Sequence, residues 1–200
     1  MIVITDIEQG SEPWFQEKIG KPSASNMDRI ITAQGKPSKQ REAYLNRLVA
    51  ERLINAPIDT YQSQAMLNGI EREAEARGWY EFIHEVEVEQ IGVVYQDKKK
   101  KYLCSPDGLI ARQKGLEIKC PEAHTQVSYL RAGTLPAQYF VQVHTSIFIC
   151  GFDEWDFFSY FPGLPIFEIT IKRNKEFCAK LKVALDEFCD ELDQLTERLR

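Results

Sequence analysis

The sequence predicts an α/β domain in which a central mixed β-sheet is flanked by helices. Three observations support this class. Apolar residues recur at helical spacing in several long segments, short aromatic and β-branched runs lie between them, and the two kinds of segment are interleaved along the chain. The 200 residues are 44% hydrophobic, and no repeat, low-complexity tract or linker divides them. We therefore expect one domain over residues 1–200.

The individual elements follow from apolar spacing, capping residues and helix breakers. Helices are expected over 13–17, 23–31, 39–54, 62–84, 122–132, 136–150 and 174–200. Strands are expected over 85–95, 102–104, 108–111, 116–119, 154–161 and 165–172. Ser23 or Ser25 can cap the second helix, Asn174 can cap the last, and Gly92 suggests a bulge in the first strand.

The helix over 62–84 carries a carboxylate within an apolar stripe. Glu73 shares one face of this helix with Met66, Ile70 and Tyr80. Two interpretations stay open at this point. Glu73 contributes to a functional site, or it forms an ion pair with Arg77, four residues on, at a partly exposed face.

Charge and cysteine content narrow the class of protein. The formal net charge of −5 argues against an indiscriminately basic nucleic-acid coat, but it allows a local basic groove. Four consecutive lysines, Lys98–Lys101, form either a local basic patch or a solvated hairpin tip. The five cysteines are odd in number and show no CxxC spacing, which argues against a disulfide framework or a zinc site.

Hydropathy indicates a cytoplasmic protein without membrane association. The first residues lack the basic start and the long apolar core of a signal peptide. No apolar run is long enough to cross a bilayer.

The segment from Ser105 to Pro121 is the most informative part of the chain, because it predicts two strands joined by a short turn. Side chains two apart on a strand share a face, so Glu117 and Lys119 project together while Leu116 and Ile118 point into apolar surroundings. Asp107 can return to the same edge through the hairpin. Two carboxylates and an amine that meet in this way suit a hard divalent cation and a water beside it.

Several motifs resemble one known family. Asp107 followed by Glu117-Ile118-Lys119 matches the PD-(D/E)xK nuclease signature, with a literal Pro106-Asp107. The wider pattern resembles the lambda-phage exonuclease (YqaJ-type viral recombinase) family. Its parts are CSPDGL from Cys104, GLEIKCP from Gly115, Gly69-x-x-x-Glu73, Tyr139-x-x-Gln142-Val143 and the opening WxxxKxGKxSAS from Trp14. The resemblance implies a restriction-endonuclease-like (PD-(D/E)xK) core in a single exonuclease domain.

The resemblance also implies an activity and a metal site. Similar proteins are Mg²⁺-dependent exonucleases that digest one strand of linear double-stranded DNA from its 5′ end, leaving 3′ overhangs for phage-type recombination by single-strand annealing. It implies one or two Mg²⁺ ions, with Mn²⁺ as a substitute, held by Asp107, Glu117 and the carbonyl of Ile118. Glu73 would approach directly or through water, and Lys119 would orient or deprotonate the attacking water.

Further residues follow from the same resemblance. It places Lys18, Ser25 and Ser105 in a 5′-phosphate pocket, and more weakly it places Asp97 and Gln142 near the metal site. Two departures stand out. Lys18 occupies a place where relatives can carry arginine, and lysine keeps the charge but loses the bidentate fork of the guanidinium. Thr125 stands where relatives carry a basic residue. For Ser25, a plain helix N-cap is the alternative.

The partners implied are double-stranded DNA ends, a single-strand annealing protein and two further copies of the chain in a homotrimeric ring, with no membrane. The compartment would be the host cytoplasm for a phage or prophage protein. A different PD-(D/E)xK nuclease, such as a restriction-type endonuclease, is one alternative, although scattered cysteines argue against a Cas4-like iron–sulfur nuclease. A non-catalytic DNA-binding scaffold for an annealing protein is another.

Overall fold

The computed structural model describes residues 1–58 and 64–200, and the side chains of its third α-helix from Arg72 onward. The α-helices are α1 (Glu12–Lys18), α2 (Arg41–Ile54), α3 (Gln64–His84), α4 (Ala123–Ala132), α5 (Phe140–Cys150) and α6 (Lys175–Leu199). The strands are β1 (Ile2–Ile4), β2 (Val88–Glu89), β3 (Val93–Tyr95), β4 (Leu103–Cys104), β5 (Gly108–Ile110), β6 (Lys114–Lys119), β7 (Glu154–Ser159) and β8 (Phe167–Lys172).

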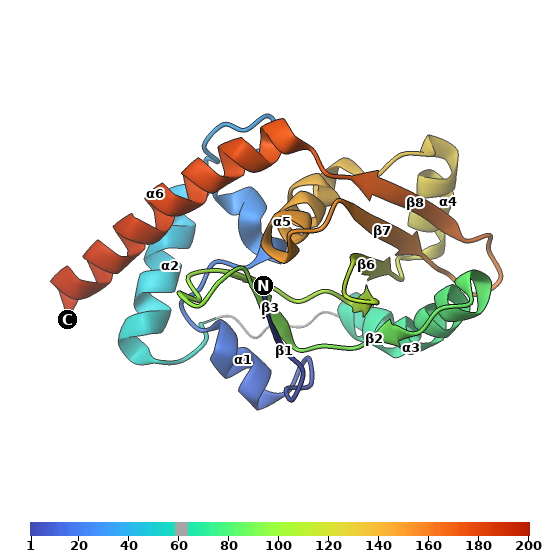
Figure 1. The fold of residues 1–200 in the computed structure, drawn as a ribbon, viewed down its shortest axis with the longest axis horizontal. Helices are drawn as coiled ribbons and strands as arrows, with labels where there is room; N and C mark the ends of the chain where they lie inside the picture. The colour runs from blue at the N-terminus through green and yellow to red at the C-terminus, as the bar shows by residue number, and fades with distance from the viewer. Residues whose placement is uncertain (59–63) are drawn as a thin grey trace.

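A five-stranded mixed sheet forms the centre of the described fold, with the strand order β2-β5-β6-β7-β8 (Figure 1). Strands β6 and β7 are parallel, and the other neighbours are antiparallel. A parallel pair needs a long crossover, which here passes through α4 and α5. A smaller antiparallel sheet has the order β1-β3-β4. The predicted α/β class with a central mixed sheet flanked by helices is confirmed.

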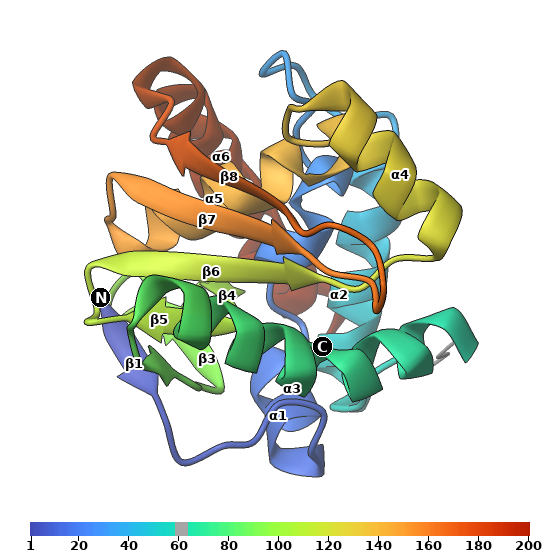
Figure 2. The ribbon, with the colours of Figure 1, turned by 90° about the vertical axis from the view of Figure 1, so that its right-hand side faces the viewer.

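Helices cover both faces of the mixed sheet. Figure 2 shows α3 across the front of β6, with α5 and α6 behind the sheet. Leu116 and Ile118 pack with Ala76 and Tyr80 of α3 on the front face. The buried Trp155 belongs to the apolar cluster that α5 and α6 complete behind it. Because side chains alternate along a strand, odd-numbered residues of β6 face the α5 side.

The sequence prediction was wrong about residues 85–95. They form two strands in different sheets, β2 and β3, instead of one strand with a bulge at Gly92. The chain changes sheets at Gly92, whose N–H donates to Ile4 O at 2.9 Å. A Cβ at Gly92 would lie 2.5 Å from Ile7 O, so only glycine allows this close backbone approach. Strand β1, which supplies that contact, was not predicted.

The predicted helix over 23–31 is a 3₁₀ helix limited to Ala24–Arg29. Ser23 holds the N-cap position without a capping side-chain bond, and Ser25 lies inside the element. The helices predicted over 39–54 and 122–132 form close to the expected bounds. Most of 136–150 is α-helical, but its first residues, Ala137–Tyr139, are a 3₁₀ turn. Of the helix expected over 62–84, residues 62 and 63 and the side chains of Met66, Gly69 and Ile70 lie outside what the structure describes.

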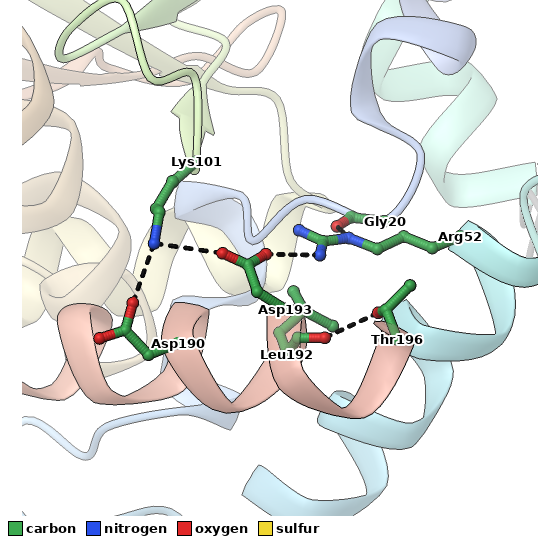
Figure 3. A network of polar contacts seen from close by, with 7 residues as sticks. All are labelled: Gly20, Arg52, Lys101, Asp190, Leu192, Asp193 and Thr196. Atoms are coloured by element: carbon green, nitrogen blue, oxygen red, sulfur yellow. Dashed lines mark hydrogen bonds and ion pairs between the residues drawn. The ribbon is translucent and has the colours of Figure 1, made fainter. Parts of the chain in front are cut away.

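The last helix is anchored at its start and along its side. Asn174 Oδ1 accepts the Phe177 N–H at 2.9 Å, which confirms the predicted cap. Figure 3 shows that the Asp193 carboxylate of α6 forms ion pairs with Lys101 and Arg52. Lys101 also forms an ion pair with Asp190. Arg52 Nε also donates to Gly20 O at 2.8 Å. These contacts join α6 to the β3–β4 hairpin and to the segment after α1.

Gly115 leaves room for the side chain of Trp155, its neighbour on the adjacent strand β7. A Cβ at Gly115 would lie 2.2 Å from a ring carbon of Trp155, which is fully buried and cannot move aside. We expect Gly115→Ala to lower the free energy of unfolding by about 2–4 kcal/mol through overpacking. Urea denaturation measures this change.

Gly78 provides a matched control, since a Cβ there meets no atom within 4 Å and the residue lies inside α3. Gly78→Ala is expected to raise the free energy of unfolding by about 0.5–1 kcal/mol. If Gly115→Ala stayed within about 0.5 kcal/mol of wild type, the close packing of Gly115 against Trp155 would be wrong.

In the described part of the chain, no helix is long and apolar enough to cross a membrane.

Candidate active site

The β5–β6 hairpin brings the first two predicted site residues together. Its turn, residues 111–113, places Ala111 and Arg112 at φ values of 48° and 53°, in the left-handed region, and the Gln113 N–H donates to Ile110 O at 3.0 Å. Gly108 pairs with Leu116 across the hairpin, and Asp107 N–H donates to Leu116 O at 3.1 Å. The Asp107 Oδ2 atom then accepts the Ile118 N–H at 2.6 Å. The carboxylate is thereby fixed beside the end of β6.

Glu117 and Lys119 share a face of β6, as the strand period predicts. Glu117 is buried, with 2% of its side chain exposed, and its Oε1 atom pairs with the ammonium of Lys119. Gln142 of α5 donates to the same oxygen at 2.5 Å. Lys119 Nζ also lies 5.5 Å from the centre of the Tyr139 ring. The weakly predicted Gln142 is thus in direct contact with a predicted metal ligand.

Glu73 reaches the same region from α3. Arg77 Nη2 donates to Glu73 Oε1 at 2.8 Å, so the ion pair suggested by the sequence is present. Glu73 and Asp107 also line one cleft. The two interpretations of Glu73 therefore hold together: it pairs with Arg77 and it faces the candidate site.

Burial raises the pKa values of all three carboxyl groups, and neighbouring carboxylates add to this effect at Glu73 and Glu117. Burial and the Asp107 charge raise the pKa of Glu73 to about 7, with Arg77 opposing. Burial, opposed by Lys119 and reinforced by Asp107, raises the pKa of Glu117 to about 7. Burial also raises the pKa of Asp107. Burial alone would lower the pKa of Lys119, but Glu117 and Asp107 outweigh it and raise that pKa above its ordinary value.

The residues fit a hard cation by the chemistry of their donors. Carboxylate and carbonyl oxygens are the ligands that Mg²⁺ takes, and a cation would relieve the mutual repulsion that the raised pKa values indicate. Across the described residues, no three His, Cys, Asp or Glu groups are arranged as a ready metal cluster. Glu117 is engaged by Lys119 and Gln142 instead, and Glu73 by Arg77.

A cleft of about 990 Å³ includes two of the three carboxylates, Glu73 and Asp107, in its lining. The same lining includes Lys18, Ser23 and Asn26. Lys18 Nζ lies 3.5 Å from the centre of the Trp14 ring, and burial lowers the pKa of Lys18 to about 8. An anionic ligand beside this ammonium would raise the pKa of Lys18 again, because it favours the charged form.

Ser25 and Ser105 each contact a residue of that cleft. Ser25 Oγ lies 3.2 Å from Ser23 Oγ, and Asn26 Nδ2 donates to both hydroxyls. Ser105 Oγ accepts the Trp14 indole N–H at 3.1 Å. Trp14 therefore joins Ser105 to Lys18.

Asp97 lies at the exposed tip of the β3–β4 hairpin. Its Oδ1 atom accepts the Lys99 N–H at 2.8 Å, and Lys100 N–H donates to Asp97 O at 3.3 Å. The lysine run thus forms the hairpin tip, which was one of its two interpretations. Within the described chain, Asp97 is not among the residues that line the cleft.

Sequence reasoning assigned no site role to Trp14, Arg77 or Tyr139. Trp14 and Tyr139 occur inside the family motifs. The signal that could have identified them is that an aromatic ring often lies against a basic side chain, as Trp14 does with Lys18 and Tyr139 with Lys119. Sequence spacing does not give the contact of Trp14 with Ser105, because 91 residues separate them.

His144 lies one turn from the site on α5 and is buried between Phe140 and Phe177. Its Nδ1 atom has no hydrogen-bond partner in the structure. Burial, assisted by Arg173, lowers the pKa of His144 from 6.5 to about 4. Between these values the unfolded chain binds a proton that the folded protein does not, so the contribution of His144 to stability falls as the pH drops from 6.5 towards 4.

We expect His144→Leu to gain about 2 kcal/mol over wild type in free energy of unfolding between pH 7 and pH 5. The difference between the two proteins isolates His144 from Glu73 and Glu117, whose raised pKa values act in the opposite direction. Urea denaturation across pH measures the gain. The control is His124→Leu, because His124 is exposed and lies on α4, outside the buried surroundings of His144. A parallel pH dependence for wild type and His144→Leu would contradict the assignment.

The geometry defines a class: an acidic residue just before β5 and an E-x-K sequence at the end of β6, the central strand of a mixed sheet, as in PD-(D/E)xK folds. Residues 13–153 match the family described as YqaJ-like viral recombinase domain. The chain belongs to this family.

Solved structures agree with the assignment. The crystal structure of an alkaline exonuclease (LHK-Exo) from Laribacter hongkongensis is 27% identical, with 94% of this chain and 96% of that chain covered and a TM-score of 0.85. The same enzyme in complex with dAMP gives 27% identity, the same coverage and a TM-score of 0.84. A phage-related exonuclease from Haemophilus somnus 129PT shares the fold at 14% identity, 90% and 96% coverage and a TM-score of 0.70. A search of curated protein sequences gave no significant match.

Proposed function

We propose that this chain is a metal-dependent deoxyribonuclease that digests one strand of linear duplex DNA from its 5′ end. The observation that carries the proposal is the convergence of Asp107, Glu117 and Lys119 at the end of β6, beside a cleft whose lining includes Asp107 and Lys18. A 27% identical relative of nearly the same length is an alkaline exonuclease, which supports the reaction class.

Asp107, Glu117 and the Ile118 carbonyl would hold Mg²⁺, with Glu73 close by. The chemistry that such an ion supplies is activation of a water and neutralisation of charge on the leaving oxygen. Gln142 holds the Glu117 carboxylate in place, and Arg77 holds Glu73. The Lys119 ammonium is positioned to donate a hydrogen bond that orients the attacking water. Its raised pKa favours this role over that of a proton acceptor in the ion-free protein.

Lys18, Ser25 and Ser105 would bind the 5′-phosphate. A phosphate needs cationic and hydroxyl donors. Trp14 contacts both Lys18 and Ser105, and Ser25 lies beside Ser23 and Asn26, which line the same cleft as Lys18. The desolvated Lys18 would regain its full charge beside a phosphate dianion.

Removing Lys18 tests the pocket. We expect Lys18→Ala to reduce the preference for a 5′-phosphorylated over a 5′-hydroxyl end by about tenfold, the loss of one charge-assisted contact. Competition between the two duplexes measures the preference, with Lys18→Arg expected to retain it. The exposed Lys175 supplies the control Lys175→Ala. An unchanged preference in Lys18→Ala would remove this residue from the pocket.

One experiment tests the reaction as a whole. Wild-type protein is incubated with linear duplex carrying defined 5′ groups and with covalently closed circular duplex, with and without Mg²⁺. The proposal expects nucleotide release from linear duplex only, from the 5′ end and only with Mg²⁺. Cleavage of the closed circle would instead support a PD-(D/E)xK endonuclease, and no release from any substrate would support a non-catalytic scaffold.

We further propose that the protein acts as a homotrimeric ring in the host cytoplasm and delivers its 3′ overhang to a single-strand annealing protein. The family membership supports this arrangement. A ring would also reconcile the net charge of −5 with a DNA substrate, because basic residues would line the channel while acidic residues cover the rim. Sedimentation velocity would exclude the ring if the protein remained a monomer with DNA present.

A further inference from the structure

Arg72 is a partly buried cation that no described carboxylate pairs with. Its guanidinium lies 4.9 Å from the centre of the Phe161 ring. The Nη1 atom is buried and has no hydrogen-bond partner among the described residues. Among the described Asp and Glu side chains, none forms an ion pair with it. The side chain as a whole remains partly exposed, so a ligand from solvent can reach it.

Arg72 lacks the carboxylate partner that another arginine of this helix has. Arg77, one and a half turns further along α3, pairs with Glu73, although its own Nε atom is also buried without a hydrogen bond. An arginine nitrogen that is desolvated without a hydrogen bond costs free energy, and such a group in a native structure calls for an explanation. Stacking on an aromatic ring fixes the guanidinium plane but leaves its N–H edge without an acceptor.

The position of Arg72 relates it to the candidate active site. Arg72 directly precedes Glu73 in α3. The Tyr160 N–H donates to Lys119 O at 2.9 Å, which places Phe161 beside the end of β6. In the sheet order, β6 separates β5, which follows Asp107, from β7, which leads to Phe161. Arg72 therefore flanks Lys119 on the β7 side.

The cleft that contains Lys18 opens on the other side. Its lining includes Asp107, Glu73 and the N-terminal segment, but not Arg72 or Phe161. A DNA strand with its 5′-phosphate at Lys18 and its scissile bond at Asp107 would continue towards the β7 side, where Arg72 lies.

We propose that Arg72 binds a backbone phosphate of duplex DNA beyond the scissile bond, on the side away from the 5′-phosphate. This inference rests on the proposed exonuclease function. A phosphate is the anion that the nucleic acid presents at regular spacing, and a stacked guanidinium offers it two parallel N–H donors. Arg72 thus binds and registers the strand and takes no part in bond cleavage.

The test compares Arg72→Gln and Arg72→Lys with wild type on a 5′-phosphorylated duplex. We expect the KM of Arg72→Gln to rise about tenfold with kcat within about threefold of wild type, because a contact made equally in ground and transition states is lost. DNA binding by Arg72→Gln, measured by fluorescence anisotropy with Ca²⁺ in place of Mg²⁺, should also depend less on salt. The slope of the logarithm of the binding constant against the logarithm of salt concentration should be smaller in magnitude by about one. Arg72→Lys should fall between the two proteins. The exposed Arg198 supplies the control, since Arg198→Gln removes the same charge elsewhere.

Duplexes with a single neutral methylphosphonate identify the phosphate. A methylphosphonate at one position downstream of the scissile bond on the digested strand should weaken binding by wild type about tenfold. It should leave binding by Arg72→Gln unaffected. If only positions on the complementary strand behave in this way, the contact to the digested strand is wrong. An unfolded Arg72→Gln would shift the decision to Arg72→Lys, which keeps the charge and the stem.

Failure of this inference and failure of the proposed function are distinguishable. Wild type that digests linear duplex while Arg72→Gln keeps its KM and salt slope would overturn the role of Arg72 alone. Wild type that neither binds nor digests DNA ends would overturn both.

Discussion

Asp107→Asn is expected to lower the rate of nucleotide release from linear duplex by about 10³-fold or more, which corresponds to ~4 kcal/mol of lost transition-state stabilisation. The amide is isosteric and can still accept the Ile118 N–H, so the strand end keeps its bond. What is lost is the negative charge that a hard cation requires as a ligand. Single-turnover digestion of a 5′-phosphorylated duplex measures the effect.

The stability of the same variant separates chemistry from folding. The pKa of Asp107 is raised by burial, so removing its charge should leave the free energy of unfolding unchanged or higher. The matched control is Asp153→Asn, where 93% of the side chain is exposed and the site is not touched. Digestion by Asp107→Asn at a rate within tenfold of wild type would contradict its assignment as a metal ligand.

Lys119→Met is expected to lower kcat by about 10²–10³-fold while KM for DNA changes little, because the ammonium acts on the reacting water. The flexible methionine retains most of the stem that packs near Tyr139. Lys119→Arg keeps the positive charge but changes the position of its donors, so it should not restore the rate. Lys172→Met, at the exposed end of β8, controls for loss of a charge.

The two lysine variants also distinguish water positioning from simple charge balance. If charge balance beside Glu117 were the whole role of Lys119, Lys119→Arg would recover most of the activity. Recovery of this kind would contradict a water-orienting ammonium and leave only the ion pair with Glu117.

The sequence predicted those parts of the fold that local patterns determine. Strand alternation was enough to place Glu117 and Lys119 on one side of β6 and Leu116 on the other, because the period of a strand is two. The capping rule located Asn174 at the start of α6. The family motifs also brought Gln142 close to Glu117, a contact that helix periodicity alone does not give.

Contacts between distant segments could not be predicted in the same way. Strand β1 has only three residues, and it forms because Val3 pairs with Val94 far along the chain. The break at Gly92 depends on that same pairing, so a pattern that looked like one strand became two. Asp156 is another example, since its burial is compensated by Tyr80, Thr170 and Lys114 from three different elements.

The β5–β6 hairpin confines both predicted carboxylate ligands, Asp107 and Glu117, to one local unit with a three-residue turn. Their separation therefore depends on hairpin register and not on how the N-terminal segment docks. Lys18 and Ser25, in contrast, come from a separate stretch of chain. The reacting centre and the surface that would select the DNA end can thus diverge independently during evolution. Preference for one kind of end could change by substitution in the first 30 or so residues while the cleavage chemistry stays intact.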